Sequence, residues 1–132
     1  MFQNQIFIID DDDDDRLFIQ QGFEENNFNN LVLFEDGHEA LKYLSFEARQ
    51  LPALIISDFN MPKITGLELL SILKQTERLK NIAVVILSTA DVKTQIDNCK
   101  KLGALEYIIK PSTTKEIANI TKRLTDYVQG IP

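Results

Sequence analysis

Residues 54–62 read Leu-Ile-Ile-Ser-Asp-Phe-Asn-Met-Pro, an apolar run that ends in a serine and an aspartate. A short apolar run bounded by polar residues is typical of a strand buried on both faces of a parallel sheet. Four further runs have this character, so the sequence predicts five short strands. The expected strands are 6–9, 31–34, 54–56, 84–87 and 107–109.

Apolar residues at helical spacing occupy the intervals between these runs. Two helices are expected at about 14–25 and 38–49, and three more carry the apolar stripes Leu67, Leu70, Leu73; Val92, Ile96, Cys99; and Ile117, Ile120, Leu124, Tyr127. Strands that alternate with helices predict a parallel sheet covered on both faces. Right-handed crossovers restrict this pattern to a doubly wound α/β sheet.

The length and charge of the chain narrow its function. Its 132 residues suit one domain, and the last expected helix runs nearly to the end, so we expect a single stand-alone domain over 1–132. With 20 acidic and 14 basic residues the net charge is −6, which argues against binding to nucleic acid or an anionic membrane.

Cellular location is inferred from the cysteine count and from apolar segments. A single cysteine, Cys99, allows no intramolecular disulfide, fits a reducing compartment and is expected in the core. No signal peptide and no apolar run of roughly 20 residues is apparent, so a cytoplasmic protein is expected.

Polar residues follow four of the five expected strands at the point where each strand ends. Ligands of an open parallel sheet bind outside these carboxyl ends. Clustered carboxylates suit Mg²⁺, a carboxylate can form an acyl phosphate, and an ammonium with a hydroxyl can neutralise a phosphoryl group. The residues therefore predict magnesium-dependent phosphoryl chemistry. They are Asp10, Asp11, Asp58, Ser88, Thr89 and Lys110.

Four motifs give the chain a family resemblance. They are Ile-Ile-Asp-Asp at 8–11, Ser-Asp-Phe-Asn-Met-Pro at 57–62 with Gly66, Leu-Ser at 87–88, and Tyr-Ile-Ile-Lys-Pro at 107–111. In this order they resemble the receiver domains of two-component response regulators over nearly the whole chain. The resemblance implies a flavodoxin-like (βα)5 fold with strand order 2-1-3-4-5, as in the chemotaxis regulator.

The resemblance also implies roles for the residues that carry the phosphoryl chemistry. Asp58 would be the phosphoacceptor, and Lys110 would pair with the charge of the new phosphoryl group. A hydroxyl would bond to that group as well, from either Ser88 or Thr89. The spacing to Ile96 in the next helix favours Ser88.

Further implied roles concern the metal and the switch. Mg²⁺ would be bound by Asp10, Asp11, Asp58 and the backbone carbonyl of Asn60. Tyr107 would turn inward when the switch hydroxyl moves. The resemblance further implies a cis bond between Lys110 and Pro111, which is more accessible before proline than elsewhere.

The partners expected from the resemblance are those of a phosphorelay. A sensor histidine kinase or a phosphotransfer protein would supply the phosphoryl group. A separate effector would read the face formed by the fourth helix, fifth strand and fifth helix. The chain would then be no enzyme, apart from self-catalysed phosphoryl uptake and autodephosphorylation.

Two other functional classes remain as alternatives. A phosphatase of the haloacid dehalogenase type would carry a second aspartate two residues after its nucleophile, where this chain has Asn60. A phosphorylation-independent interaction module of the same fold usually lacks one or more of the site residues, and here the set from Asp10 to Lys110 is intact.

Several of these residues also have purely structural interpretations. The remaining aspartates of the run, Asp12–Asp15, are expected to be a solvated helix start favoured by the helix dipole. Gly66 is explained by close packing of its turn. His38 is expected to face solvent, and Thr65 stands where the family often has an acidic residue.

Overall fold

The computed structural model describes residues 2–46 and 50–131, and strands and helices alternate within them. The strands are β1 (Phe2–Ile9), β2 (Leu31–Phe34), β3 (Leu51–Ser57), β4 (Ala83–Ser88) and β5 (Glu106–Ile109). The helices are α1 (Asp13–Glu25), α2 (Gly37–Leu44), α3 (Gly66–Gln75), α4 (Lys93–Lys101) and α5 (Thr114–Gln129). All five expected strands are present, and β1 and β3 begin earlier than the apolar runs suggested.

The five strands form one parallel sheet in the order β2-β1-β3-β4-β5. The predicted doubly wound fold and strand order are therefore confirmed. In this register Ile9 of β1 lies opposite Ser57 of β3. The aspartates that follow, Asp10 and Asp58, consequently emerge side by side from the middle of the sheet.

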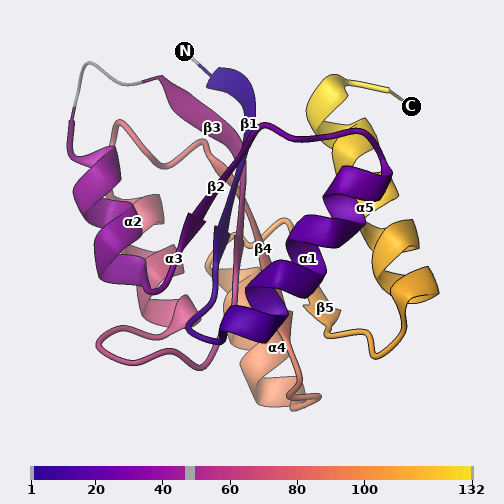
Figure 1. Ribbon diagram of the computed structural model, residues 1–132. Coiled ribbons are helices and arrows are strands. Elements are labelled where there is room, and N and C mark those ends of the chain that lie inside the picture. The colour runs from indigo at the N-terminus through magenta and orange to yellow at the C-terminus, as the bar shows by residue number, and fades with distance from the viewer. Residues whose placement is uncertain (1, 47–49, 132) are drawn as a thin grey trace.

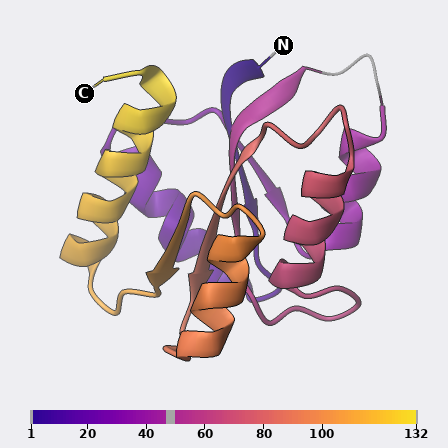
Figure 2. The ribbon, with the colours of Figure 1, turned by 180° about the vertical axis from the view of Figure 1, so that it is seen from behind.

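Helices cover both faces of the sheet, as Figures 1 and 2 show: α1 and α5 lie on one face, and α2, α3 and α4 lie on the other. Alternate residues of each strand supply the two core layers. Phe7 and Ile9 of β1 pack with the α2–α4 layer, whereas Ile6 and Ile8 pack with the α1–α5 layer. This double burial explains why the central strands read as uninterrupted apolar runs.

Helix α2 is shorter than its apolar spacing suggested. It ends at Leu44, where the hydroxyl of Ser45 donates a hydrogen bond to the carbonyl of Lys42. The expected extension over 45–49 is wrong at Ser45 and Phe46, and residues 47–49 lie outside the described residues.

Two members of the expected helical stripes are exposed. Val92 is the N-cap of α4, before the helix has turned its apolar side toward the sheet, and Tyr127 lies beyond the last buried turn of α5. Cys99 is fully buried and His38 is exposed, as expected.

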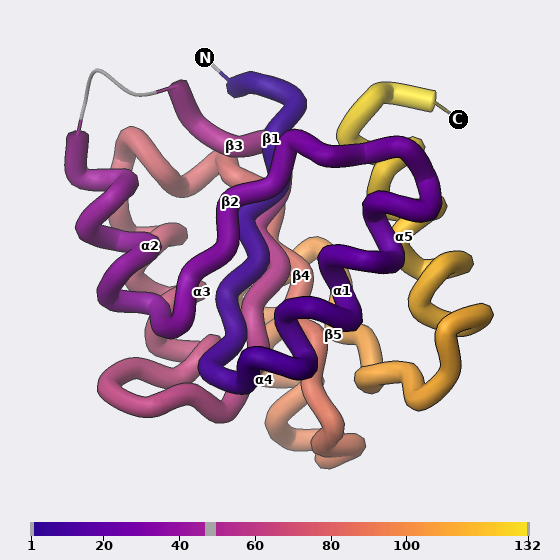
Figure 3. Tube along the Cα trace, viewed as in Figure 1, coloured from indigo at the N-terminus to yellow at the C-terminus, as the bar shows by residue number. Residues whose placement is uncertain are grey.

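Both ends of the described chain lie at the same end of the molecule, away from the carboxyl ends of the strands (Figure 3). In the described part of the chain, the helices are all too short or too polar to cross a bilayer.

Candidate functional site

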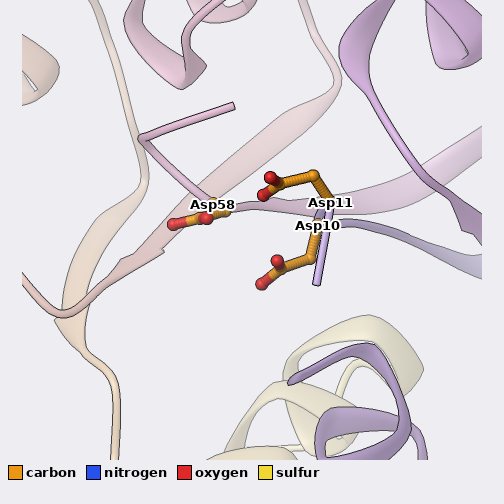
Figure 4. A group of neighbouring side chains, drawn as sticks. All are labelled: Asp10, Asp11 and Asp58. Carbon is orange, nitrogen blue, oxygen red and sulfur yellow. The ribbon is translucent and has the colours of Figure 1, made fainter. Parts of the chain in front are cut away.

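Three carboxylates meet where β1 and β3 end. The amide of Asp58 donates to the carbonyl of Ile9 (2.9 Å), which locks the two strand ends together. One carboxylate oxygen from each of Asp10, Asp11 and Asp58 lies within 4.8 Å of the other two, and Figure 4 shows the three side chains together. Oxygen ligands at this separation fit a hard divalent cation such as Mg²⁺.

Two of these carboxylates are buried. Asp10 is 1% exposed and Asp58 is 9% exposed. Burial raises the pKa of both side chains, and the nearby charge of Asp10 raises the pKa of Asp58 further. Hydrogen bonds from the amides of Asp12 (3.0 Å) and Phe59 (2.8 Å) offset this only in part. The cluster therefore favours the arrival of positive charge.

Lys110, at the end of β5, brings one positive charge to this cluster. Its Nζ lies 3.0 Å from Asp10, 2.8 Å from Asp15 and 3.4 Å from Asp58. Burial alone would lower the pKa of Lys110, but hydrogen bonds to the Asp15 and Asp10 carboxylates outweigh it and raise that pKa. The ammonium therefore remains charged at neutral pH.

The bond that follows Lys110 differs from the expected one. No peptide bond among the described residues is cis, so the bond between Lys110 and Pro111 is trans, the lower-energy form. The amide of Lys110 donates to the carbonyl of Ser88 (2.8 Å), which anchors β5 to β4 at this point. The side chain reaches the carboxylates from this position without a cis bond.

Asp15 is a neighbour of Lys110 that the sequence interpretation missed. Asp12, Asp13 and Asp14 are exposed at the start of α1, as a solvated helix start predicts. Asp15 instead points toward Lys110. Helical spacing was the available signal, because Asp15 precedes the buried Ile19 by four positions and so belongs to the inward side of α1.

The two candidate switch hydroxyls at the end of β4 have different surroundings. Ser88 is fully buried, and its hydroxyl accepts a hydrogen bond from the amide of Ala90 (3.1 Å). Thr89 is exposed and lines a cavity of about 200 Å³ together with Asp15 and Lys110. The end of β4 thus presents one hydroxyl to the interior, and the β4–α4 loop that follows presents one to solvent.

Tyr107 connects β5 to that same loop. Its hydroxyl donates to the carbonyl of Ala90 (2.7 Å) and accepts from the side chain of Gln95 in α4 (2.7 Å). The half-buried ring also packs against the core layer of α2–α4. Tyr107 therefore lies inward, in contact with the residue whose amide bonds to Ser88.

The turn after Asp58 is tightly built. Asn60 is exposed, two positions beyond Asp58. Gly66 lies so close to this turn that an added Cβ would stand 2.4 Å from the carbonyl oxygen of Asp58, which confirms the packing interpretation of this glycine. Thr65 caps α3 in a reciprocal capping box with Glu68, a local reason for threonine at that position.

Comparisons with known proteins identify the family of this chain. The two-component response regulator ORR5 of rice, Oryza sativa subsp. japonica, is 37% identical over 90 residues, covering 68% of this chain and 66% of that protein. The chain thus spans just under two thirds of that relative's length. The crystal structure of the phosphorylated cyanobacterial phytochrome response regulator RcpA superposes with a TM-score of 0.86 at 30% identity, covering 96% of this chain and 94% of that chain.

A second solved structure has a similar fold. The Mn²⁺-bound form of response regulator Rcp1 superposes with a TM-score of 0.84 at 24% identity, covering 98% of each chain. A family model for the response regulator receiver domain matches residues 6–122, which include every strand end that contributes to the site. The chain belongs to the response regulator receiver domain family.

Proposed function

We propose that this chain is a phospho-accepting signalling switch in which Asp58 takes up the phosphoryl group. The observation that supports this most is the grouping of Asp58 with Asp10 and Asp11, with the ammonium of Lys110 beside them. Such a site has a carboxylate nucleophile, oxygen ligands for a cation and a fixed positive charge, which are the parts that phosphoryl transfer uses.

In the proposed reaction a carboxylate oxygen of Asp58 attacks the phosphorus of the donor. The new bond is an acyl phosphate, the donor's bond to phosphorus breaks, and its electron pair leaves with the donor. With a phosphohistidine donor, the released imidazole nitrogen takes a proton from solvent. Asp10, Asp11, Asp58 and the backbone carbonyl of Asn60 would hold Mg²⁺, which when bound offsets the charge of the phosphoryl oxygens.

The protein's own groups then stabilise the product. Lys110 lies close enough to Asp58 to move its ammonium onto a phosphoryl oxygen. In this proposal the hydroxyl of Ser88 turns toward the phosphoryl group and loses the hydrogen bond that it accepts from the amide of Ala90. Because Tyr107 bonds to the carbonyl of Ala90, a displacement of this residue is transmitted to β5 and to α4.

The face formed by α4, β5 and α5 would carry the signal to a partner. Val92, Leu105 and Ile109 are apolar side chains that are exposed there, at 49%, 46% and 42%. Exposed apolar side chains gain from burial against another protein, so a change in their arrangement alters partner affinity. A downstream effector protein is the proposed reader of this face.

The remaining parts of the proposal concern the phosphoryl donor and the cellular location of the chain. We place the chain in the cytoplasm, where a sensor histidine kinase or a phosphotransfer protein donates the phosphoryl group. The net charge of −6 supports protein partners over nucleic acid. Apart from its own phosphorylation and dephosphorylation, the chain turns over no substrate in this proposal.

Incubation with acetyl phosphate and Mg²⁺, followed by intact-mass measurement, tests the proposal. We expect one added phosphoryl group on the parent, none on Asp58→Asn, and the parental result on Asp36→Asn, which removes a different buried carboxylate. Ser88→Ala and Thr89→Ala in parallel identify the hydroxyl, with slower uptake expected for Ser88→Ala. A parent that stays unmodified, and that forms no beryllofluoride complex although it binds Mg²⁺, would contradict the proposal.

A further inference from the structure

We infer that Asp15 is a positioning residue that holds the ammonium of Lys110 toward α1 and thereby slows phosphoryl uptake at Asp58. This inference rests on the proposed function, because it concerns the lysine that would bind the phosphoryl group. It assigns a role to an aspartate whose carboxylate lies outside the cluster of Asp10, Asp11 and Asp58.

The contacts of Lys110 carry the inference. A lysine ammonium has three hydrogens to donate and no acceptor. Here it donates hydrogen bonds to Asp15 (2.8 Å) and Asp10 (3.0 Å), whereas its contact with Asp58 is an ion pair at 3.4 Å. The shortest of its three contacts is therefore the one with Asp15, and the longest is the one with the phosphoacceptor.

The position of Asp15 is set by the start of α1. Asp12 caps the helix by accepting a hydrogen bond from the amide of Asp15 (3.0 Å). This places Asp15 on the third helical residue, one turn before the buried Ile19, so that its side chain is directed at Lys110. The same side chain is 43% exposed, whereas Asp10 is 1% exposed. Asp15 is thus the contact that Lys110 gives up at the lowest desolvation cost.

One effect follows for an incoming phosphoryl group. Its oxygens need the ammonium of Lys110 closer to Asp58 than the present 3.4 Å, whereas the 2.8 Å hydrogen bond to Asp15 holds the ammonium toward α1. The contact with Asp15 therefore has to lengthen before the phosphoryl group is neutralised, which opposes uptake. The partly exposed Asp15 side chain can relieve this by turning away.

Asp15→Asn tests the inference, with Asp14→Asn as its matched control. Both variants remove one negative charge from adjacent positions of the same helical turn, but Asp14 is exposed and lies outside the contacts of Lys110. With acetyl phosphate at saturating Mg²⁺ we expect uptake in Asp15→Asn to be about two- to fivefold faster than in Asp14→Asn, as for release of a partly exposed ion pair. Asp15→Glu, which restores the charge, should return the rate to within about twofold of the parent.

Mg²⁺ affinity, followed by fluorescence or calorimetry, is the second readout. A general change in the electrostatic field at the site would change the Mg²⁺ affinity. Loss of the contact with Lys110 alone should leave Asp14→Asn and Asp15→Asn with equal Mg²⁺ affinities. Faster uptake with equal affinity supports the inference. Equal or slower uptake in Asp15→Asn than in Asp14→Asn, with a parent that is phosphorylated, overturns the inference alone. A parent that takes up no phosphoryl group overturns both the inference and the proposed function.

Discussion

Two turns of this molecule each follow a strand and contain a buried aspartate, but the two aspartates differ in the direction of their pKa shift. Asp36 lies in the turn between β2 and α2, and Asp58 begins the turn between β3 and α3. Their exposures are close, 7% and 9%. Yet the pKa of Asp36 is lowered and the pKa of Asp58 is raised.

The difference comes from burial of the Asp58 carboxylate and from the partners of the Asp36 carboxylate. Asp36 caps α2 by accepting from the amide of Glu39 (2.9 Å), and it forms an ion pair with Lys63 (3.3 Å), so its charge is compensated. For Asp58, burial and the charge of Asp10 outweigh its hydrogen bond from Phe59 and its contact with Lys110. The first turn uses an aspartate to stabilise the fold, and the second leaves one under-compensated, which suits the proposed phosphoryl uptake.

The largest expected effect is a loss of stability when the glycine near each turn, Gly66 or Gly37, is replaced by alanine. An alanine Cβ at Gly66 would stand 2.4 Å from the backbone oxygen of Asp58, whereas one at Gly37 would meet the side chain of Ile64 at 2.6 Å. Backbone in a packed turn cannot yield, but the end of an isoleucine can turn away. We expect Gly66→Ala to lower the free energy of unfolding by about 3 kcal/mol and Gly37→Ala by less than about 1 kcal/mol.

Urea denaturation of both glycine variants measures this contrast. Equal losses would mean that the β2–α2 turn is as rigid as the turn that carries Asp58. Phosphoryl uptake by the folded fraction of Gly66→Ala provides a further check, because a displaced turn moves Asp58 itself.

A smaller loss is expected from removal of the structural aspartate. Asp36→Ala deletes the N-cap of α2 and leaves the amide of Glu39 without this acceptor, so the free energy of unfolding should fall by about 1–2 kcal/mol. Asp36→Asn keeps an acceptor and should lose less. Phosphoryl uptake should be unchanged in both variants, and slower uptake would contradict the assignment of a purely structural role.

Much of this comparison was predictable from the sequence. Strand positions followed from the apolar runs, because central strands of a parallel sheet are buried on both faces and tolerate few polar residues. The strand order followed from the family resemblance. The meeting of Asp10 with Asp58 followed as well, since both directly follow such runs. The extra length of β1 was not predicted because the strand begins with polar residues. The early start of β3 was not predicted because it contains Pro52.

What was missed depends on side-chain partners from distant segments. The contact of Asp15 with Lys110 joins residues 95 positions apart. The aspartates at 12–15 were interpreted as a uniformly solvated helix start, although helical geometry turns Asp15 toward the site. The early end of α2 likewise reflects local capping by Ser45, which the apolar spacing does not encode.

The pH dependence of stability should also differ between the turns. Because the folded pKa of Asp36 lies below the usual value of about 3.9, its charge stabilises the fold fully above about pH 4. This contribution is lost as the pH falls through the lower folded pKa. The stability difference between the parent and Asp36→Asn, less than about 1 kcal/mol at neutral pH, should therefore shrink toward zero as the pH falls below the folded pKa. A difference that grows on acidification would contradict the sign.

The smallest effect is expected at Asp58 and should have the opposite sign. Its raised pKa means that the fold disfavours the ionised form at neutral pH, and that this penalty is relieved only as the pH falls below the folded value. Asp58→Asn removes the charge, keeps an acceptor for the amide of Phe59 and leaves Lys110 paired with Asp10 and Asp15. In urea denaturation with EDTA present, we expect a gain of about 0.5 kcal/mol. Asp36→Asn, the same chemical change in the other turn, is the control. If both variants lost stability equally, the Asp58 carboxylate would be as well compensated as that of Asp36, and its readiness for chemistry would have to come from bound Mg²⁺ rather than from the folded chain.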